Sequence, residues 1–352
     1  MSRFFNTKFN QLVPYTPGEQ PKDMEYVKLN TNESPFPPSQ KAQMYANKAS
    51  EKLQLYSDPE CRELVKKACE YFGVEADEII FTNGSDEVLN FAFMAFCENG
   101  AVFPDITYGF YSVFAQLNGV EFKEIPLKQD FTVDVNQYKG INKTIFLANP
   151  NAPTGIALSV EEIEEIVKSN PENVVIIDEA YVDFGAKSVV PLIKKYDNLL
   201  VTQTFSKSRS LAGGRLGFGI GSKALIRDLN TIKYSTNPYN VNSVTAAAGV
   251  GSLEDDEYIK DNCEKIKQNR EYLNKELEKL NFTMTDSSAN FIFAKHCSVS
   301  GKNIYLKLKE KGVLVRHFEK PRLEDFVRIT IGSKEQLDIL IAKIAESLKE
   351  LL

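Results

Sequence analysis

The chain has 352 residues, of which 43% are apolar, so it can bury a large core and is long for a single domain. Its 42 lysines and arginines stand against 48 aspartates and glutamates, and the net charge of −6 argues against a nucleic-acid partner. No apolar run approaches ~18 residues and the first residues lack the apolar core of a secretory signal, so we expect a cytoplasmic protein that does not span a membrane.

Metal and disulfide chemistry have few candidate residues. The five cysteines are odd in number and include no Cys-x-x-Cys pair, and the chain has only two histidines. We therefore expect neither a metal site nor a disulfide framework, and the two histidines leave few candidates for a histidine-centred catalytic triad.

The chain begins with a proline-rich segment, residues 1–39, which we expect to form an arm over the smaller of two domains. From about residue 40 to 250 the pattern alternates helices with short apolar strands. Such alternation predicts an α/β fold with a mostly parallel, seven-stranded sheet covered by helices on both faces. The predicted strands are residues 78–82, 101–103, 121–125, 144–148, 174–178, 199–204 and 217–220.

The first of these strands leads into Asn83-Gly-Ser-Asp-Glu87, which opens an apolar helix. The backbone amides of Gly84, Ser85 and Asp86 would then point at an anion, with the helix dipole behind them. A plain N-cap on a strand-to-helix turn is the alternative if no partner charge lies nearby.

An aromatic cluster follows the second strand. Tyr108 stands just past the strand end, where a flat side chain can stack on a planar ligand. Phe110 and Tyr111 compete for that role, and any of the three can instead belong to the core.

Two later strands end on charged residues. The strand at 174–178 ends on Asp178, at the carboxyl edge where open α/β sheets bind ligands. The strand at 199–204 leads to Lys207, and an arginine, Arg215, follows eight positions later. Thr204 and Ser206 can add hydroxyl donors at the same edge.

The pattern changes after residue 250, where we expect a smaller α+β domain over residues 251–352. A long charged helix runs from residue 256 to about 279, and a last helix begins at Ser333, which forms a capping box with Gln336. An equivalent box at Ser159 and Glu162 opens a helix of the larger domain. The predicted strands of the smaller domain are 282–285, 290–294, 312–315 and 326–330.

An amine, a carboxylate and a phosphate-binding arginine are the three charges that hold pyridoxal phosphate (PLP). Lys207 can form a Schiff base with the aldehyde, Asp178 can keep the ring nitrogen protonated, and Arg215 can pair with the phosphate. Tyr108 can stack on the ring, and the hydroxyl of Tyr181 can donate to the ring oxygen. The set resembles that of a fold-type I PLP aminotransferase.

Further motifs narrow this resemblance to the histidinol-phosphate aminotransferases of class I/II, and they extend over nearly the whole chain. Three of them are more particular to this branch: the Pro-Tyr-x-Pro-Gly arm, Asn-x-Asn-Glu and Pro-Tyr-Asn-Val-Asn. The matching segments include Leu12–Gly18, Leu29–Pro35, Tyr56–Pro59, Asn149–Gly155, Asp178–Tyr181, Pro238–Asn242, Ser288–Phe291 and Val327–Thr330.

The resemblance implies a homodimer in which Tyr56 reaches the partner's PLP phosphate. It also implies that Arg316 and Arg328 hold the substrate anion, helped by Tyr15 and Asn32 from the arm. The chain departs from the family where Ala152 replaces an asparagine expected to bond the ring oxygen, so either Asn151 takes its place or Tyr181 acts alone. A second departure is Arg209, which lies either on the surface or near the site as an added charge.

The implied reaction is the transfer of an amino group between histidinol phosphate and 2-oxoglutarate, giving imidazole acetol phosphate and glutamate. An aromatic amino-acid aminotransferase or a threonine-phosphate decarboxylase would use the same scaffold. An alternative of another class is a catalytically silent PLP-fold domain used for binding.

Overall fold

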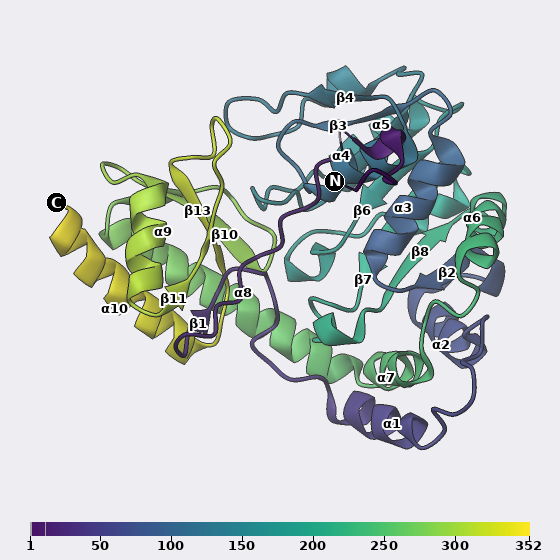
Figure 1. The fold of residues 1–352 in the computed structure, drawn as a ribbon, viewed down its shortest axis with the longest axis horizontal. Helices are drawn as coiled ribbons and strands as arrows, with labels where there is room; N and C mark the ends of the chain where they lie inside the picture. The colour runs from purple at the N-terminus through teal and green to yellow at the C-terminus, as the bar shows by residue number, and fades with distance from the viewer. Residues whose placement is uncertain (1, 11) are drawn as a thin grey trace.

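The larger part of the molecule is built on a seven-stranded sheet with the order β2-β8-β7-β6-β5-β3-β4 (Figure 1). The computed structural model describes residues 2–10 and 12–352. Strand β8 runs antiparallel to both of its neighbours, and the other pairs are parallel. The strands are β2 (Ile79–Thr82), β3 (Ala101–Pro104), β4 (Phe122–Ile125), β5 (Thr144–Ala148), β6 (Val175–Asp178), β7 (Leu199–Thr204) and β8 (Gly217–Gly221).

Helices cover both faces of this sheet because its central strands are apolar on both sides. In β6, Val175 and Ile177 belong to one hydrophobic cluster, whereas Ile176 between them belongs to another. The first cluster includes residues of α2 (Arg62–Phe72), α5 (Val160–Lys168) and α7 (Ser243–Leu253); the second includes residues of α3 (Ser85–Phe96), α4 (Phe110–Asn118) and α6 (Lys223–Thr236). The predicted mostly parallel sheet of seven strands is therefore confirmed.

A separate hydrophobic core lies in the smaller unit, on the left of Figure 1. It packs a four-stranded antiparallel sheet, in the order β12-β13-β10-β9, against three helices. The capping boxes predicted at Ser159 and Ser333 are both present. The elements are α8 (Asp256–Lys279), β9 (Phe282–Met284), β10 (Phe291–His296), α9 (Gly301–Glu310), β12 (Arg316–His317), β13 (Phe326–Thr330) and α10 (Lys334–Leu351).

The strand predicted at residues 312–315 is present, although it is shorter than expected and pairs outside the four-stranded sheet. Strand β11 (Val313–Leu314) pairs in parallel with β1 (Val27–Lys28) of the N-terminal arm. The next strand, β12, pairs instead with β13. The arm therefore contributes a strand to the smaller unit, which a reading of local sequence patterns could not foresee.

The arm continues from β1 across the molecule to α1 (Gln40–Ser50), which packs against α7 (Figure 1). Leu29 of the arm is buried in the smaller core. The division into an arm (1–39), a large domain (40–250) and a small domain (251–352) stays a prediction, and Met1 and Gln11 lie outside the described residues. No helix in the described ranges is both long and apolar enough to cross a membrane.

Gly217 ties the sheet to the start of α3 and provides a test of the packing. A Cβ atom at this position would lie 2.1 Å from the Ser85 nitrogen, so Gly217→Ala forces backbone to move. We expect urea denaturation to show a loss of about 1–3 kcal/mol in the free energy of unfolding. Gly213→Ala is the matched control, because no described atom lies within 4 Å of its added Cβ. Equal midpoints for both variants would contradict the close packing.

Candidate active site

A cavity of about 450 Å³ opens at the carboxyl ends of the central strands, where the arm and the smaller unit meet the sheet. Strand ends in a parallel sheet meet at one edge, which explains why residues far apart in sequence converge here. Most of the residues predicted from the sequence line this cavity: Tyr15, Asn32, Ser85, Asp86, Tyr108, Asp178, Tyr181, Thr204, Ser206, Lys207, Arg215, Arg316 and Arg328.

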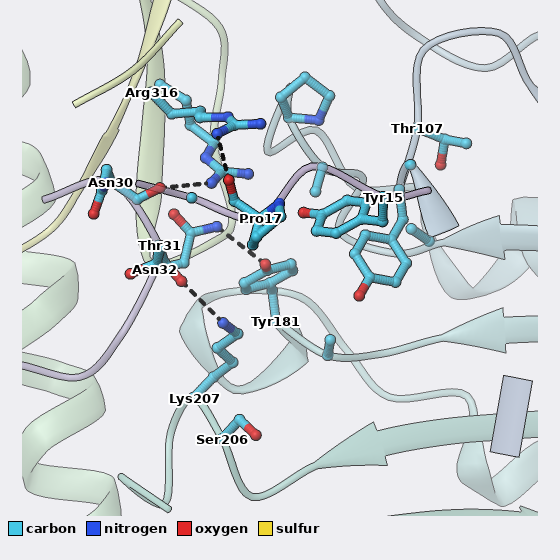
Figure 2. A pocket seen from close by; sticks show the side chains of 18 of the residues that line it. Tyr15, Pro17, Asn30, Thr31, Asn32, Thr107, Tyr181, Ser206, Lys207 and Arg316 are labelled. Atoms are coloured by element: carbon cyan, nitrogen blue, oxygen red, sulfur yellow. Dashed lines mark hydrogen bonds between the residues drawn. The ribbon is translucent and has the colours of Figure 1, made fainter. Parts of the chain in front are cut away.

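Lys207 occupies the turn that follows β7, and its side chain points into the cavity (Figure 2). Its Nζ donates a hydrogen bond of 3.2 Å to the carbonyl of Thr31 in the arm. The turn is fixed by backbone bonds, with the Leu211 amide donating to the Phe205 carbonyl and the Ser206 amide donating to Oγ1 of Thr204. The amine therefore stands at a defined place above the strand end.

Asp178 is a buried carboxylate at the end of β6. Tyr111 donates to its Oδ2 at 3.2 Å, and Thr202 and the Ala180 amide donate to Oδ1 at 3.3 and 3.2 Å. Burial raises the pKa of Asp178 to about 6, although the hydrogen bond from Tyr111 acts in the opposite direction. A cationic ring nitrogen beside this carboxylate would stabilise its ionised form. Tyr111 is thus a support for Asp178, a role that its position in the sequence did not indicate.

The predicted anion-binding turn lies at the start of α3, but one of its three amides is already used. The Gly84 amide donates to the Thr82 carbonyl at 2.9 Å, so the expectation that it faces an anion is wrong. Ser85 and Asp86 remain in the first turn of α3, where amides have no partner within the helix.

The guanidinium of Arg215 lies directly over this turn. Its Nη2 is 3.1 Å from Oδ2 of Asp86, and a Cβ atom at Gly84 would come within 2.7 Å of it. Glycine is therefore needed at residue 84 both for its φ of +80° and for the approach of Arg215. Helix amides, a guanidinium and the nearby hydroxyls of Thr204 and Ser206 form a donor set that suits a phosphate.

Two tyrosines frame the cavity between these charges. The hydroxyl of Tyr108 donates to Oδ1 of Asp86 at 2.7 Å, and its ring lies beside the stacked pair of Tyr15 and Phe110. The hydroxyl of Tyr181 accepts a hydrogen bond of 3.0 Å from the side-chain amide of Asn32 (Figure 2).

Asn151 does not line the cavity, contrary to the prediction. Its side-chain amide nitrogen donates to the Ile106 carbonyl and to Thr154, and its oxygen accepts from Thr107. These bonds hold the loop after β5, while Ala152 lines the cavity instead. Tyr181 is therefore the remaining candidate of the two for bonding a ring oxygen.

Arg316 and Arg328 face each other across the antiparallel pair of β12 and β13, in direct register. Like charges in that position repel, and burial together with Arg316 lowers the pKa of Arg328. Arg328 Nη2 donates to the Asn30 carbonyl at 3.0 Å. Arg316 donates to the Thr16 carbonyl at 3.2 Å and to the Pro17 carbonyl at 3.3 Å (Figure 2). No acidic side chain pairs with either arginine in the described residues, so an anionic ligand would supply the missing charge.

Two predicted residues lie away from the cavity of their own chain. Tyr56 is 86% exposed and stacks on Tyr239, with ring centroids 4.7 Å apart. Arg209, by contrast, is only 2% exposed and lies over the rings of Tyr71 and Phe205. It is therefore neither a surface residue nor part of the cavity lining.

The cavity residues fit PLP. A buried carboxylate with a raised pKa, a donor cradle built over a glycine and an amine on a fixed turn are the features that its ring nitrogen, phosphate and aldehyde require. The arginine pair adds a separate anion site in the same cavity.

Residues 24–344 match the family of class I and II aminotransferases. The sequence is 48% identical to histidinol-phosphate aminotransferase of Brachyspira hyodysenteriae over 355 residues, covering 99% of this chain and 100% of the relative. It is 46% identical to the enzyme of that name from Clostridium beijerinckii, covering 98% and 97%. The solved structure of histidinol-phosphate aminotransferase from Sinorhizobium meliloti, in complex with pyridoxal-5′-phosphate, has a TM-score of 0.91 over 100% of this chain and 99% of that chain. Its sequence is 22% identical, so it shows the shared fold.

The raised pKa of Asp178 predicts a pH-dependent stability for the cofactor-free protein. The ordinary pKa is 3.8 and the folded value about 6, so the folded chain holds an extra proton between them and loses stability as the pH rises through that window. Asp178→Asn cannot ionise. Relative to wild type, we expect it to gain about 1–3 kcal/mol of stability between about pH 4 and pH 7.5 in urea denaturation. If the free energy of unfolding changed with pH in the same way for both proteins, ionisation of the buried Asp178 would not destabilise the fold, contrary to this prediction.

Proposed function

The chain belongs to the class I and II aminotransferases, and we propose that it transfers an amino group between histidinol phosphate and 2-oxoglutarate, with PLP as cofactor. The products are imidazole acetol phosphate and glutamate, a reaction of histidine biosynthesis. The observation that carries this proposal is the opposed pair of Arg316 and Arg328 in the cavity that also holds Lys207. Two guanidiniums match a phosphate dianion, since each can donate two hydrogen bonds. The names of the relatives at 46 and 48% identity point to the same substrate.

PLP supplies an electron sink that stabilises negative charge at the substrate carbon from which a proton is removed. Asp178 would hold the ring nitrogen, and the first turn of α3 with Arg215 would hold the phosphate. Tyr108 would lie against the ring, and Tyr181 would donate to its oxygen.

Lys207 would move the proton at the substrate Cα. Its Nζ lies in the cavity at hydrogen-bond distance from a main-chain carbonyl. In the described residues it forms no ion pair with a carboxylate. An amine at this place can accept the proton and return it to a neighbouring carbon.

The arm would complete the substrate site. Tyr15 lines the cavity with its ring centroid 6.4 Å from that of Tyr108, and Asn32 is bonded to Tyr181. The long bonds from Arg316 to Thr16 and Pro17 can be exchanged for stronger bonds to a phosphate. Arg328 would serve both half-reactions, binding the phosphate of one substrate and the α-carboxylate of glutamate.

The proposal includes a homodimer in which Tyr56 reaches the partner's cofactor phosphate, and a cytoplasmic location. Tyr56 extends from its own subunit and does not line its own cavity in the described residues. Exposed apolar side chains accompany it: Leu53 and Leu55 precede it in the chain, and Tyr239 stacks on its ring. Such side chains together suit contact with a second copy.

The first test removes the amine. Lys207→Ala should lower the turnover of histidinol phosphate with 2-oxoglutarate by roughly a thousandfold or more, since the amine on the turn after β7 would both attach the cofactor and move the proton. Lys320→Ala, which removes the other lysine of the cavity, should keep turnover of the same order as wild type. Assays with phenylalanine, tyrosine and threonine phosphate complete the panel. A wild-type enzyme that used those compounds and not histidinol phosphate would contradict the proposed substrate.

The second test separates the two arginines. Arg316→Gln removes one charge-assisted contact, worth about 1.5–3 kcal/mol or roughly ten- to a hundredfold in affinity, and should raise KM more for histidinol phosphate than for glutamate. Arg328→Gln should impair both substrates. Equal effects of Arg316→Gln on the two substrates would assign this arginine a structural role.

A further inference from the structure

Lys233 is a buried lysine outside the candidate active site. It lies near the end of α6 and is 3% exposed. Its Nζ donates a hydrogen bond of 2.7 Å to the carbonyl of Pro59. Within the described residues this main-chain carbonyl is the only hydrogen-bond partner of the Lys233 side chain, and no carboxylate lies within ion-pair distance of it. Burial lowers the pKa of Lys233, so the fold bears a desolvation cost at this position.

The bond from Lys233 fixes a bend between α1 and α2. Asp58 accepts hydrogen bonds from the amides of Glu60 and Arg62 at 3.2 and 3.0 Å. Cys61 adopts a left-handed conformation with φ of +49°, which is unfavourable for a residue with a side chain. A strained bend of this kind persists only where surrounding contacts determine it.

Tyr56 stands at the start of the same bend. Its ring stacks on Tyr239, which lies in the loop between α6 and α7. The next residue of that loop, Asn240, donates to Glu87 at 2.6 Å and accepts from Asn83 at 3.1 Å. Helix α6 and the loop that follows it therefore contact this bend at two places: Lys233 holds the Pro59 carbonyl, and Tyr239 stacks on the ring of Tyr56.

We propose that Lys233 is a positioning residue for the neighbouring subunit's active site. By holding the Pro59 carbonyl it keeps the bend in place, and so keeps Tyr56 directed out of its own subunit. This inference rests on the proposed sharing of Tyr56 across a homodimer. It has a consequence that a purely local role for Lys233 lacks: its loss impairs the partner's cofactor site and spares its own.

Hybrid dimers test this consequence. A dimer of one wild-type and one Lys207→Ala protomer, purified with two different tags, has a single site able to attach PLP, in the wild-type protomer. In the trans hybrid, Lys233→Met is placed on the Lys207→Ala chain, which lends its Tyr56 to that site. In the cis hybrid, Lys233→Met is placed on the chain that carries Lys207.

The cofactor-free hybrids are titrated with PLP, and both the visible absorption of attached PLP and the recovered transamination are followed. The trans hybrid should need about tenfold more PLP than the parent hybrid, the scale of one lost contact from a charged donor. The cis hybrid should match the parent. Loss in the cis hybrid, in both hybrids or in neither would overturn the proposal.

Two controls complete the design. Lys66→Met makes the same change at an exposed lysine of α2, which lines the same surface pocket as Lys233, and should alter neither hybrid. Tyr56→Phe placed on each chain in turn tests the premise. If it fails to act in trans, the shared tyrosine and this inference both fall. If it acts in trans while Lys233→Met does not, only the role of Lys233 falls. Should Lys233→Met not fold, Lys233→Gln keeps a neutral donor and should act in trans with a smaller loss.

Discussion

The parallel register of β6 and β7 is the constraint on which the site depends. Asp178 pairs with Thr202, so the carboxylate ends its strand beside a hydroxyl that bonds to it. Because β7 continues two residues further before its turn, Lys207 rises at the same edge of the sheet and not beneath it. Strand β8 returns next to β7, and Gly217 lets it touch the turn that opens α3. One sheet edge thus brings together an amine, a carboxylate and an anion cradle.

Two features of this cavity cost stability in the protein without ligands. Asp178 is buried without a cation, and Arg316 and Arg328 oppose each other. Each cost would be offset by a ligand group of the right charge: a protonated ring nitrogen for Asp178 and a substrate anion for the arginine pair. Electrostatic strain of this kind is what a site built for charged ligands carries before they bind.

The arm closes the cavity by supplying main-chain carbonyls to these cations. Lys207 donates to Thr31, Arg328 to Asn30, and Arg316 to Thr16 and Pro17. Neutral carbonyls are weaker partners than carboxylates or phosphates, so they can satisfy the cations without competing strongly with a charged ligand. The pairing of β1 with β11 attaches the arm to the smaller unit, which also carries the arginine pair on β12 and β13.

The sequence by itself determined what is local: apolar strands that end on Asp178 and near Lys207, capping boxes, and a glycine turn before a helix. Such features depend on residues a few positions apart, so their patterns predict them. Only the tertiary structure decided which polar groups remain free. It assigned the Gly84 amide to Thr82 and Asn151 to the loop after β5, made Tyr111 a partner of Asp178, and buried Arg209 and Lys233. Hydrogen-bond partners and burial depend on segments far apart in the chain, so a local sequence pattern cannot predict them.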